Sequence, residues 1–195
     1  PVVLTLGTKY VIEGNEAWWQ DYIREHVSVV AMNEEEGAAL TGETDPLKAA
    51  NAALEWVDLV LCTAGPNGLY MAGYADDKVK RETSHETLEG SIDNFNKYEF
   101  SRAMRKSDCE NPIKVYSHIG PYLGGPLKIK NTNGAGDAAL SALLHDMAAN
   151  SFHQKEVPSS EKHAVRCLTY SSLSQICKYA NRVSYEVLTQ HSPRL

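Results

Sequence analysis

Three continuous apolar runs stand in the first third of the chain, and segments with helical spacing separate them. The runs cover residues 2–6, 27–33 and 57–64 and are rich in valine and leucine, which is typical of strands buried on both faces. The segments with helical spacing are residues 16–26, 34–42 and 45–56. This alternation predicts a parallel sheet with helices on its faces, because parallel neighbours need helical crossovers.

The pattern changes after Gly65. Residues 65–77 indicate a turn followed by an antiparallel strand, whereas residues 75–112 are polar and poorly periodic, which predicts an insertion. Strand character returns later, and two helical segments close the chain. The predicted later strands are residues 113–119 and 127–131, and the predicted helices are residues 135–149 and 161–189.

Composition narrows the class of protein. A chain of 195 residues with 43% hydrophobic residues can bury the core of a single domain. The formal net charge of −6 argues against nucleic acid as a partner, because binding to phosphates needs clustered lysine and arginine. No apolar run reaches the ~20 residues that a membrane span requires. We therefore expect no membrane partner.

The four cysteines form no CxxC pair and no zinc spacing, so we expect a reduced, cytoplasmic protein. The chain opens with Pro1 and runs at once into a predicted strand. We expect it to be part of a longer protein.

The sequence Gly134-Ala135-Gly136-Asp137 lies between a short apolar stretch and a predicted helix. Glycines allow a tight turn and a close approach of the backbone to a ligand. The helix that follows directs its free amides and the positive end of its dipole at this turn, which favours an anion. Asp137 would repel a bound anion, but a site that removes a proton from a hydroxyl beside a phosphate needs such a base.

Three interpretations of this turn compete. It can be an ordinary helix start with an acidic first turn, a dinucleotide fingerprint, or part of a phosphoryl-transfer site. The fingerprint expects a further strand that ends in an acidic residue ~20 positions later, whereas residues 151–163 read as a polar loop. A Walker loop is excluded because the chain has no Gly-Lys dipeptide.

Two distant segments favour phosphoryl transfer. Asn33 and Glu36 form an NxxE pattern at a helix start, where an amide and a carboxylate can hold magnesium and its waters. Thr63, Gly65 and Gly68 follow a strand at its carboxyl end, where open α/β sheets bind ligands. Each pattern is weak alone, but their order along the chain is specific.

These residues resemble the motifs of the PfkB or ribokinase family of carbohydrate and nucleoside kinases. That family carries an NxxE magnesium motif, a TxGxxG nucleotide loop and a DTxGAGD anion-hole motif, which here read as residues 33–36, 63–68 and 131–137. The resemblance implies a three-layer α/β/α ribokinase-like fold with a mostly parallel central sheet. It also implies that residues 1–195 are the C-terminal, nucleotide-binding part of one kinase domain, without its N-terminal substrate and lid half.

The resemblance assigns a role to each matching position. Asp137 would be the base that deprotonates the 5′-hydroxyl of a purine nucleoside, inosine or guanosine. The amides of Gly134, Ala135 and Gly136 would stabilise the transferred γ-phosphoryl group of ATP. Asn33 and Glu36 would organise Mg²⁺. The implied ATP contacts are Thr63, Gly65, Gly68, Thr132, Asn133, Asn181 and Lys9.

Two motifs depart from the family pattern. Asn131 stands where the family usually has an aspartate, and the strand motif DxNxR is here Thr5, Gly7 and Lys9. K⁺ as a second cation and assembly into a homodimer both stay open. The rival functions are a PfkB-family sugar kinase and a non-catalytic nucleotide-binding regulator. Because the substrate half is expected elsewhere, we predict that the 195-residue chain alone phosphorylates poorly or not at all.

Overall fold

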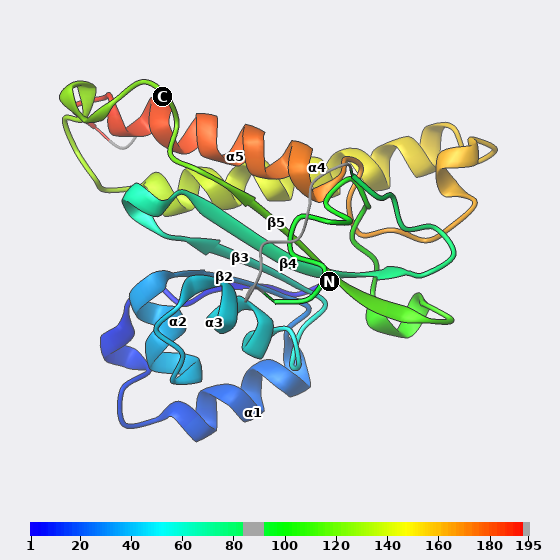
Figure 1. Ribbon diagram of the computed structural model, residues 1–195, viewed down its shortest axis with the longest axis horizontal. Helices are drawn as coiled ribbons and strands as arrows, with labels where there is room; N and C mark the ends of the chain where they lie inside the picture. Colours follow the sequence, from blue (N-terminus) through cyan, green and yellow to red (C-terminus); the bar gives the residue numbers. More distant parts are fainter. Residues whose placement is uncertain (84–91, 193–195) are drawn as a thin grey trace.

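One five-stranded sheet organises the protein (Figure 1). The computed structural model describes residues 1–83 and 92–192. The sheet has the order β1-β2-β3-β4-β5. Its strands are β1 Val3–Thr5, β2 Val29–Asn33, β3 Leu59–Thr63, β4 Leu69–Asp76 and β5 Pro112–Ile119. The α-helices are α1 Glu16–His26, α2 Glu34–Thr41, α3 Pro46–Ala53, α4 Ala135–Glu156 and α5 Leu173–Leu188.

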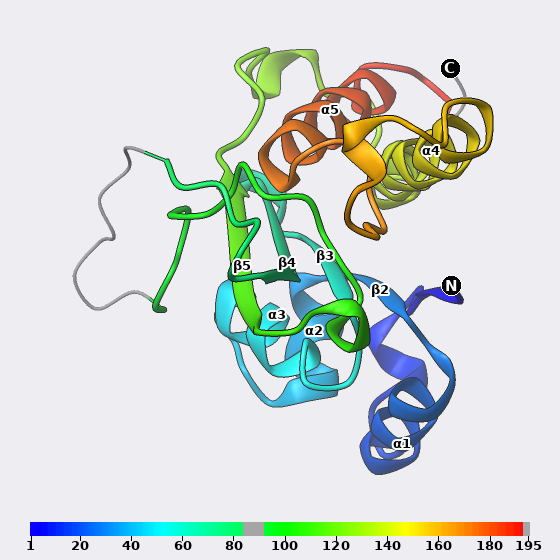
Figure 2. The same ribbon diagram turned by 90° about the vertical axis from the view of Figure 1, so that its right-hand side faces the viewer.

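The helices form two layers with the sheet between them. Helices α1, α2 and α3 lie on one side of the sheet, and α4 and α5 lie on the other (Figures 1 and 2). The predicted three-layer α/β/α class is therefore confirmed. Within the described ranges, no helix has both the length and the apolar character needed to cross a bilayer.

The continuous apolar strands supply both layers because successive side chains of a strand point to opposite faces. In β2, Val29 and Ala31 belong to the core under α4 and α5. Their neighbours Val30 and Met32 belong to the core under α1 to α3. This is why these runs read as unbroken apolar sequence rather than as alternating sequence.

Strand direction agrees with the predicted mostly parallel sheet. Strands β1, β2 and β3 are parallel, and β4 pairs antiparallel with both β3 and β5. Among the strands of the described chain, β4 alone therefore runs against the others. The register pairs Asn33 with Thr63 and Thr63 with Leu69. The carboxyl ends of β2 and β3 therefore lie side by side.

Two sequence predictions about later elements are wrong. Residues 127–131 are not a strand: a 3₁₀ turn, Pro126–Lys128, is followed by backbone whose amides bond to the end of α5. The last helix begins at Leu173 rather than at residue 161, because Ser172 and Gln175 form a capping box there. Before it, the carboxylate of Asp146 accepts the amides of Tyr170 and Ser171, which holds that backbone outside a helix.

The helix predicted over residues 135–149 is longer than expected. Helix α4 continues to Glu156.

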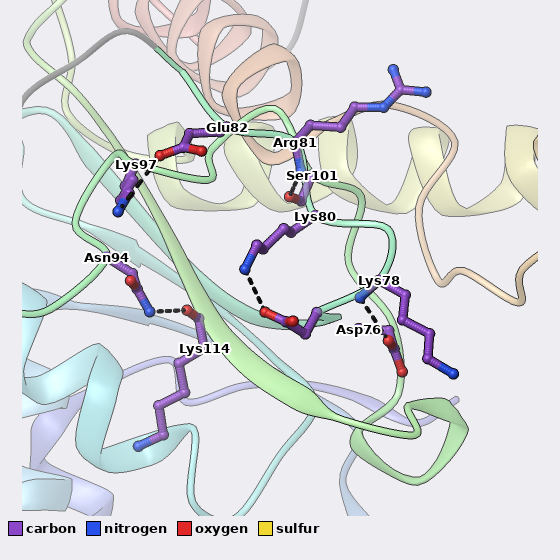
Figure 3. A network of polar contacts seen from close by, with 10 residues as sticks. Asp76, Lys78, Lys80, Arg81, Glu82, Asn94, Lys97, Ser101 and Lys114 are labelled. Atoms are coloured by element: carbon purple, nitrogen blue, oxygen red, sulfur yellow. Dashed lines mark hydrogen bonds and ion pairs between the residues drawn. The ribbon is translucent and has the colours of Figure 1, made fainter.

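The predicted insertion at residues 75–112 is the connection between β4 and β5. Strand β4 continues to Asp76, which pairs with Pro112, so the connection proper is residues 77–111, of which 84–91 lie outside the described residues. Asp76 joins the two ends of this connection, because its buried carboxylate accepts hydrogen bonds from the amides of Lys78 and Asn111 at 3.0 and 3.1 Å. Further along, the amide of Arg81 donates to Ser101 (Figure 3).

Candidate functional site

The loop after β3 is pressed against the end of β5. It forms a 3₁₀ turn, Gly65–Asn67, and continues through Gly68 with φ of 86°. A Cβ at Gly68 would lie 1.9 Å from the carbonyl oxygen of Ile119, so only glycine fits. His118 reinforces this contact, because its Nε2 lies 2.8 Å from the carbonyl oxygen of Asn67. Sequence reasoning missed His118, which belongs to no motif.

The NxxE segment forms a closed start to α2. The Oδ1 of Asn33 accepts the amide of Glu36 at 2.8 Å, and the backbone amide of Asn33 donates to the carboxylate of Glu36 at 2.9 Å. The Nδ2 of Asn33 donates to the other carboxylate oxygen at 3.0 Å. This reciprocal pair is a capping box, which explains why an asparagine and a glutamate stand three residues apart.

The carboxyl group of Glu36 has a raised pKa. Its side chain is 5% exposed, and burial raises the pKa of its carboxyl group. The hydrogen bond from Asn33 opposes that rise, while the negative charge of Asp137 adds to it. The carboxylates of Glu36 and Asp137, from α2 and α4, are therefore close enough to interact.

Helix α4 begins in the opposite way. Its N-cap is Gly134, which has φ of 80° and provides no side-chain cap. The first amides of a helix have no partner inside the helix, so those of Ala135 and Gly136 are free to bind a ligand. Asp137 follows in the first turn and is exposed. Just before this turn, the side chain of Asn131 accepts a hydrogen bond from the amide of Asn133 at 2.9 Å, which holds the backbone that leads into α4.

These segments meet around a cavity of about 660 Å³. It lies between the loop after β3, the start of α4 and one face of α5. The structure thus brings together predicted site residues that are up to 148 positions apart in the sequence, from Asn33 to Asn181. The predicted site residues that line the cavity are Asn33, Thr63, Gly65, Gly68, Thr132, Ala135, Gly136 and Asn181.

The other predicted site residues lie outside this lining. Gly134, Asp137 and Asn133 are sequence neighbours of lining residues at the start of α4, and Glu36 bonds to the lining residue Asn33. Lys9 lies in a 3₁₀ turn, Lys9–Val11, and its ammonium group pairs with Glu35 at 3.0 Å. The hydrogen bond with Glu35 raises the pKa of Lys9.

Part of the cavity wall carries no motif, and sequence reasoning missed it. Pro121, Tyr122, Pro126 and Ile129 line the cavity from the segment between β5 and α4. Tyr185 and Leu188 line it from α5. The one usable signal is the spacing of Asn181 and Tyr185, which places them one helical turn apart on the same face.

The donor set of Asn33 and Glu36 limits how a metal can be held. Among the described residues, no group of three or more His, Cys, Asp or Glu side chains could hold a metal ion. Mg²⁺ usually keeps several waters and uses only one or two carboxylates beside phosphates. The residues present therefore fit a magnesium ion bound largely through water.

Solved structures with the same fold are sugar and nucleoside kinases. Adenosine kinase from Sinorhizobium meliloti superposes with a TM-score of 0.57 at 16% identity, over 99% of this chain and 41% of that chain. Aminoimidazole riboside kinase from Salmonella enterica, solved with aminoimidazole riboside and an ATP analogue, gives a TM-score of 0.51 at 16% identity, over 97% and 46%. The fold is therefore that of the ribokinase-like kinases.

A much closer sequence relative is the guanosine-inosine kinase of Escherichia coli strain K12. It is 68% identical to this chain over all 195 residues, which correspond to 45% of its own length. The chain thus spans about half the length of the curated relatives it matches. No family model matches the chain.

Proposed function

We propose that this chain is the nucleotide-binding and catalytic part of a kinase that transfers the γ-phosphoryl group of ATP to the 5′-hydroxyl of inosine or guanosine. The products would be the nucleoside monophosphates, as in purine salvage. One observation carries the proposal. The uncapped start of α4 opens into the same cavity as the loop after β3, with an exposed carboxylate beside it.

The open helix start suits a migrating phosphoryl group. The amides of Ala135 and Gly136 are fixed in place before the reaction, so they can stabilise charge that develops on the phosphoryl oxygens without reorganising. Gly134 has the αL conformation and offers no side-chain cap, and Ala135 and Gly136 line the cavity. Thr63, Gly65 and Gly68 would contact the rest of the ATP phosphates from the opposite wall.

Asp137 would act as the general base. It would accept the proton of the 5′-hydroxyl as that oxygen attacks the γ-phosphorus, while the bond from the γ-phosphorus to the bridging oxygen breaks and releases ADP. The protonated carboxyl group would then return its proton to solvent. A base must reach its proton within hydrogen-bond distance. An exposed carboxylate in the first turn of α4 is suited to this because no buried contact restrains it.

Asn33 and Glu36 would hold Mg²⁺ through water. When bound, the ion neutralises phosphate charge. The effect of the Asp137 charge, which adds to the rise of the Glu36 pKa, supports this proposal. We also propose a potassium requirement, assembly into a homodimer and a phosphate contact from Lys9.

The nucleoside specificity is proposed from the relative alone. At 68% identity over this chain, we expect the same acceptors as the E. coli guanosine-inosine kinase. The 195 residues correspond to less than half of that relative. We therefore propose that most nucleoside contacts come from other residues of the complete protein, and that the isolated chain phosphorylates poorly or not at all.

A substrate panel tests the proposal. The full-length protein would be given MgATP with inosine, guanosine, adenosine, ribose or fructose, and ADP release would be followed. We expect turnover with inosine and guanosine that exceeds the other acceptors by at least tenfold. Preference for ribose or fructose would favour a sugar kinase, and ATP binding without turnover on any acceptor would favour a non-catalytic regulator.

A further inference from the structure

The segment between β5 and α4 forms one wall of the cavity, yet burial does little to hold it. Leu123 and Leu127 have exposed fractions of 100% and 101%. Apolar burial is the main force that fixes a segment of chain, and here two large apolar side chains contribute none. Specific contacts must therefore set the position of this wall.

Two side chains of α5 supply such contacts. The Nδ2 of Asn181 donates to the carbonyl oxygen of Gly120 at 2.9 Å. One turn further along the helix, the phenol of Tyr185 donates to the carbonyl oxygen of Gly125 at 2.9 Å. Residues four apart lie on the same face of a helix. Residues 120–125 of this wall are thus fastened to one face of α5 at two points.

The ring of Tyr185 also fixes the shape of the wall between these points. A Cβ at Gly124 would lie 2.1 Å from the Cζ of Tyr185, so the backbone there lies directly on the ring. The ring of Tyr122 covers another part of it, with ring centroids 5.0 Å apart. Tyr122, Gly125 and Tyr185 all line the cavity. The contact between Tyr185 and residues 122–125 is therefore part of the cavity wall itself.

We propose that Tyr185 is a positioning residue for ATP, because it holds residues 121–126 in the arrangement that receives the nucleotide. This inference rests on the proposed function, in which ATP occupies the cavity. A preformed wall spares the cost of ordering the loop when the ligand binds. The effect should consequently appear in the affinity for ATP and not in the chemical step.

Tyr185→Phe tests the hydrogen bond while keeping the ring. In the full-length protein we expect the KM for ATP to rise about threefold to tenfold, as the loss of one hydrogen bond implies. We expect kcat and the KM for inosine to stay within about twofold. Tyr179→Phe is the matched control, because Tyr179 is an exposed ring on the same helix that does not line the cavity.

Gly124→Ala tests the contact with the ring. It should raise the KM for ATP more than Gly120→Ala, because a Cβ at Gly120 meets no atom within 4 Å. Combining Gly124→Ala with Tyr185→Ala removes the collision. The double variant should therefore be no worse than Tyr185→Ala alone, a non-additive result that a general loss of folding would not give.

Calorimetric binding of ATP separates this inference from the proposed function. A wild-type protein that binds ATP without phosphorylating nucleosides would refute the proposed function alone, and the variants' dissociation constants would still test the role of Tyr185. A wild-type affinity for ATP in Tyr185→Phe would overturn the inference. So would a fall in kcat with unchanged KM, or a Gly124→Ala variant no weaker in ATP binding than Gly120→Ala.

Discussion

Helices α2 and α4 both begin at the cavity, and both carry an acidic residue at the third helical position. In α2 that residue is Glu36, and the N-cap Asn33 bonds to both of its carboxylate oxygens. In α4 it is Asp137, and the N-cap Gly134 has no side chain to offer. One helix start is closed on itself and the other is open. The N-cap residue decides between a self-satisfied helix end and one that can bind an anion.

The difference also appears in burial. Glu36 is buried, and Asp137 is exposed. A buried carboxylate that already accepts hydrogen bonds is held in place, whereas an exposed one is free to meet a substrate. We therefore propose that the fixed carboxylate organises the metal and that the free one transfers the proton, and the following predictions test that division.

The largest effect is expected at the open helix start. Asp137→Asn in the full-length protein should lower kcat about 10²-fold to 10⁴-fold, the usual contribution of a general base. The KM for ATP and the unfolding midpoint should change little, because Asp137 is exposed. Steady-state kinetics and urea denaturation measure both. Glu156→Gln, at the far end of the same helix, is the control; equal kcat values for it and Asp137→Asn would exclude Asp137 as the base.

A smaller effect, on stability, is expected at the closed helix start. Asn33→Ala removes the side-chain cap of α2 and one of the two donors to the buried Glu36, its Nδ2, which should lower the free energy of unfolding by about 1–3 kcal/mol. Ser172→Ala removes the same type of cap from α5 and should cost a similar amount without changing the KM for ATP. If Asn33→Ala unfolds at the wild-type urea concentration, the capping box does not stabilise the protein.

The smallest effects concern pH and have opposite signs at two carboxylates. Burial raises the pKa of Glu36. Its contribution to stability should therefore fall as pH rises from its unfolded pKa of about 4.3 through the raised folded value. Hydrogen bonds from backbone amides, first that of Lys78, lower the pKa of Asp76. Its contribution should be present above about pH 3.9 and lost as pH falls through the folded value.

Urea denaturation between pH 3 and pH 7 measures this contrast. Relative to wild type, Glu36→Gln should gain stability as pH rises above 4, whereas Asp76→Asn should lose relative stability as pH rises from 3 toward 4 and then stay level. Parallel pH profiles for wild type and Glu36→Gln would show that the environment of Glu36 does not disfavour its charged form.

Local sequence patterns predicted the strands and helix starts that depend on short-range preferences. The apolar runs predicted β2 and β3 because a strand buried on both faces has no polar alternation. The helical segment predicted from residue 45 begins there as α3, because Asp45 caps the first turn and Pro46 stands at its first position. The strand predicted at residues 127–131 failed for the opposite reason. The amides of Lys130 and Asn131 bond to the carbonyl of Leu188, about 58 positions away, and no local pattern records that contact.

The amino-acid order alone establishes which chemical groups follow one another along this chain: an asparagine and a glutamate after one strand, glycines after the next, and an aspartate at a glycine-rich helix start. The folded arrangement adds that α5 completes the cavity through Asn181 and Tyr185, and that Lys9 pairs with Glu35 outside the cavity lining. The reason is physical. Glycines and caps act within a turn of backbone, whereas a cavity wall is set by contacts between segments that only folding brings together.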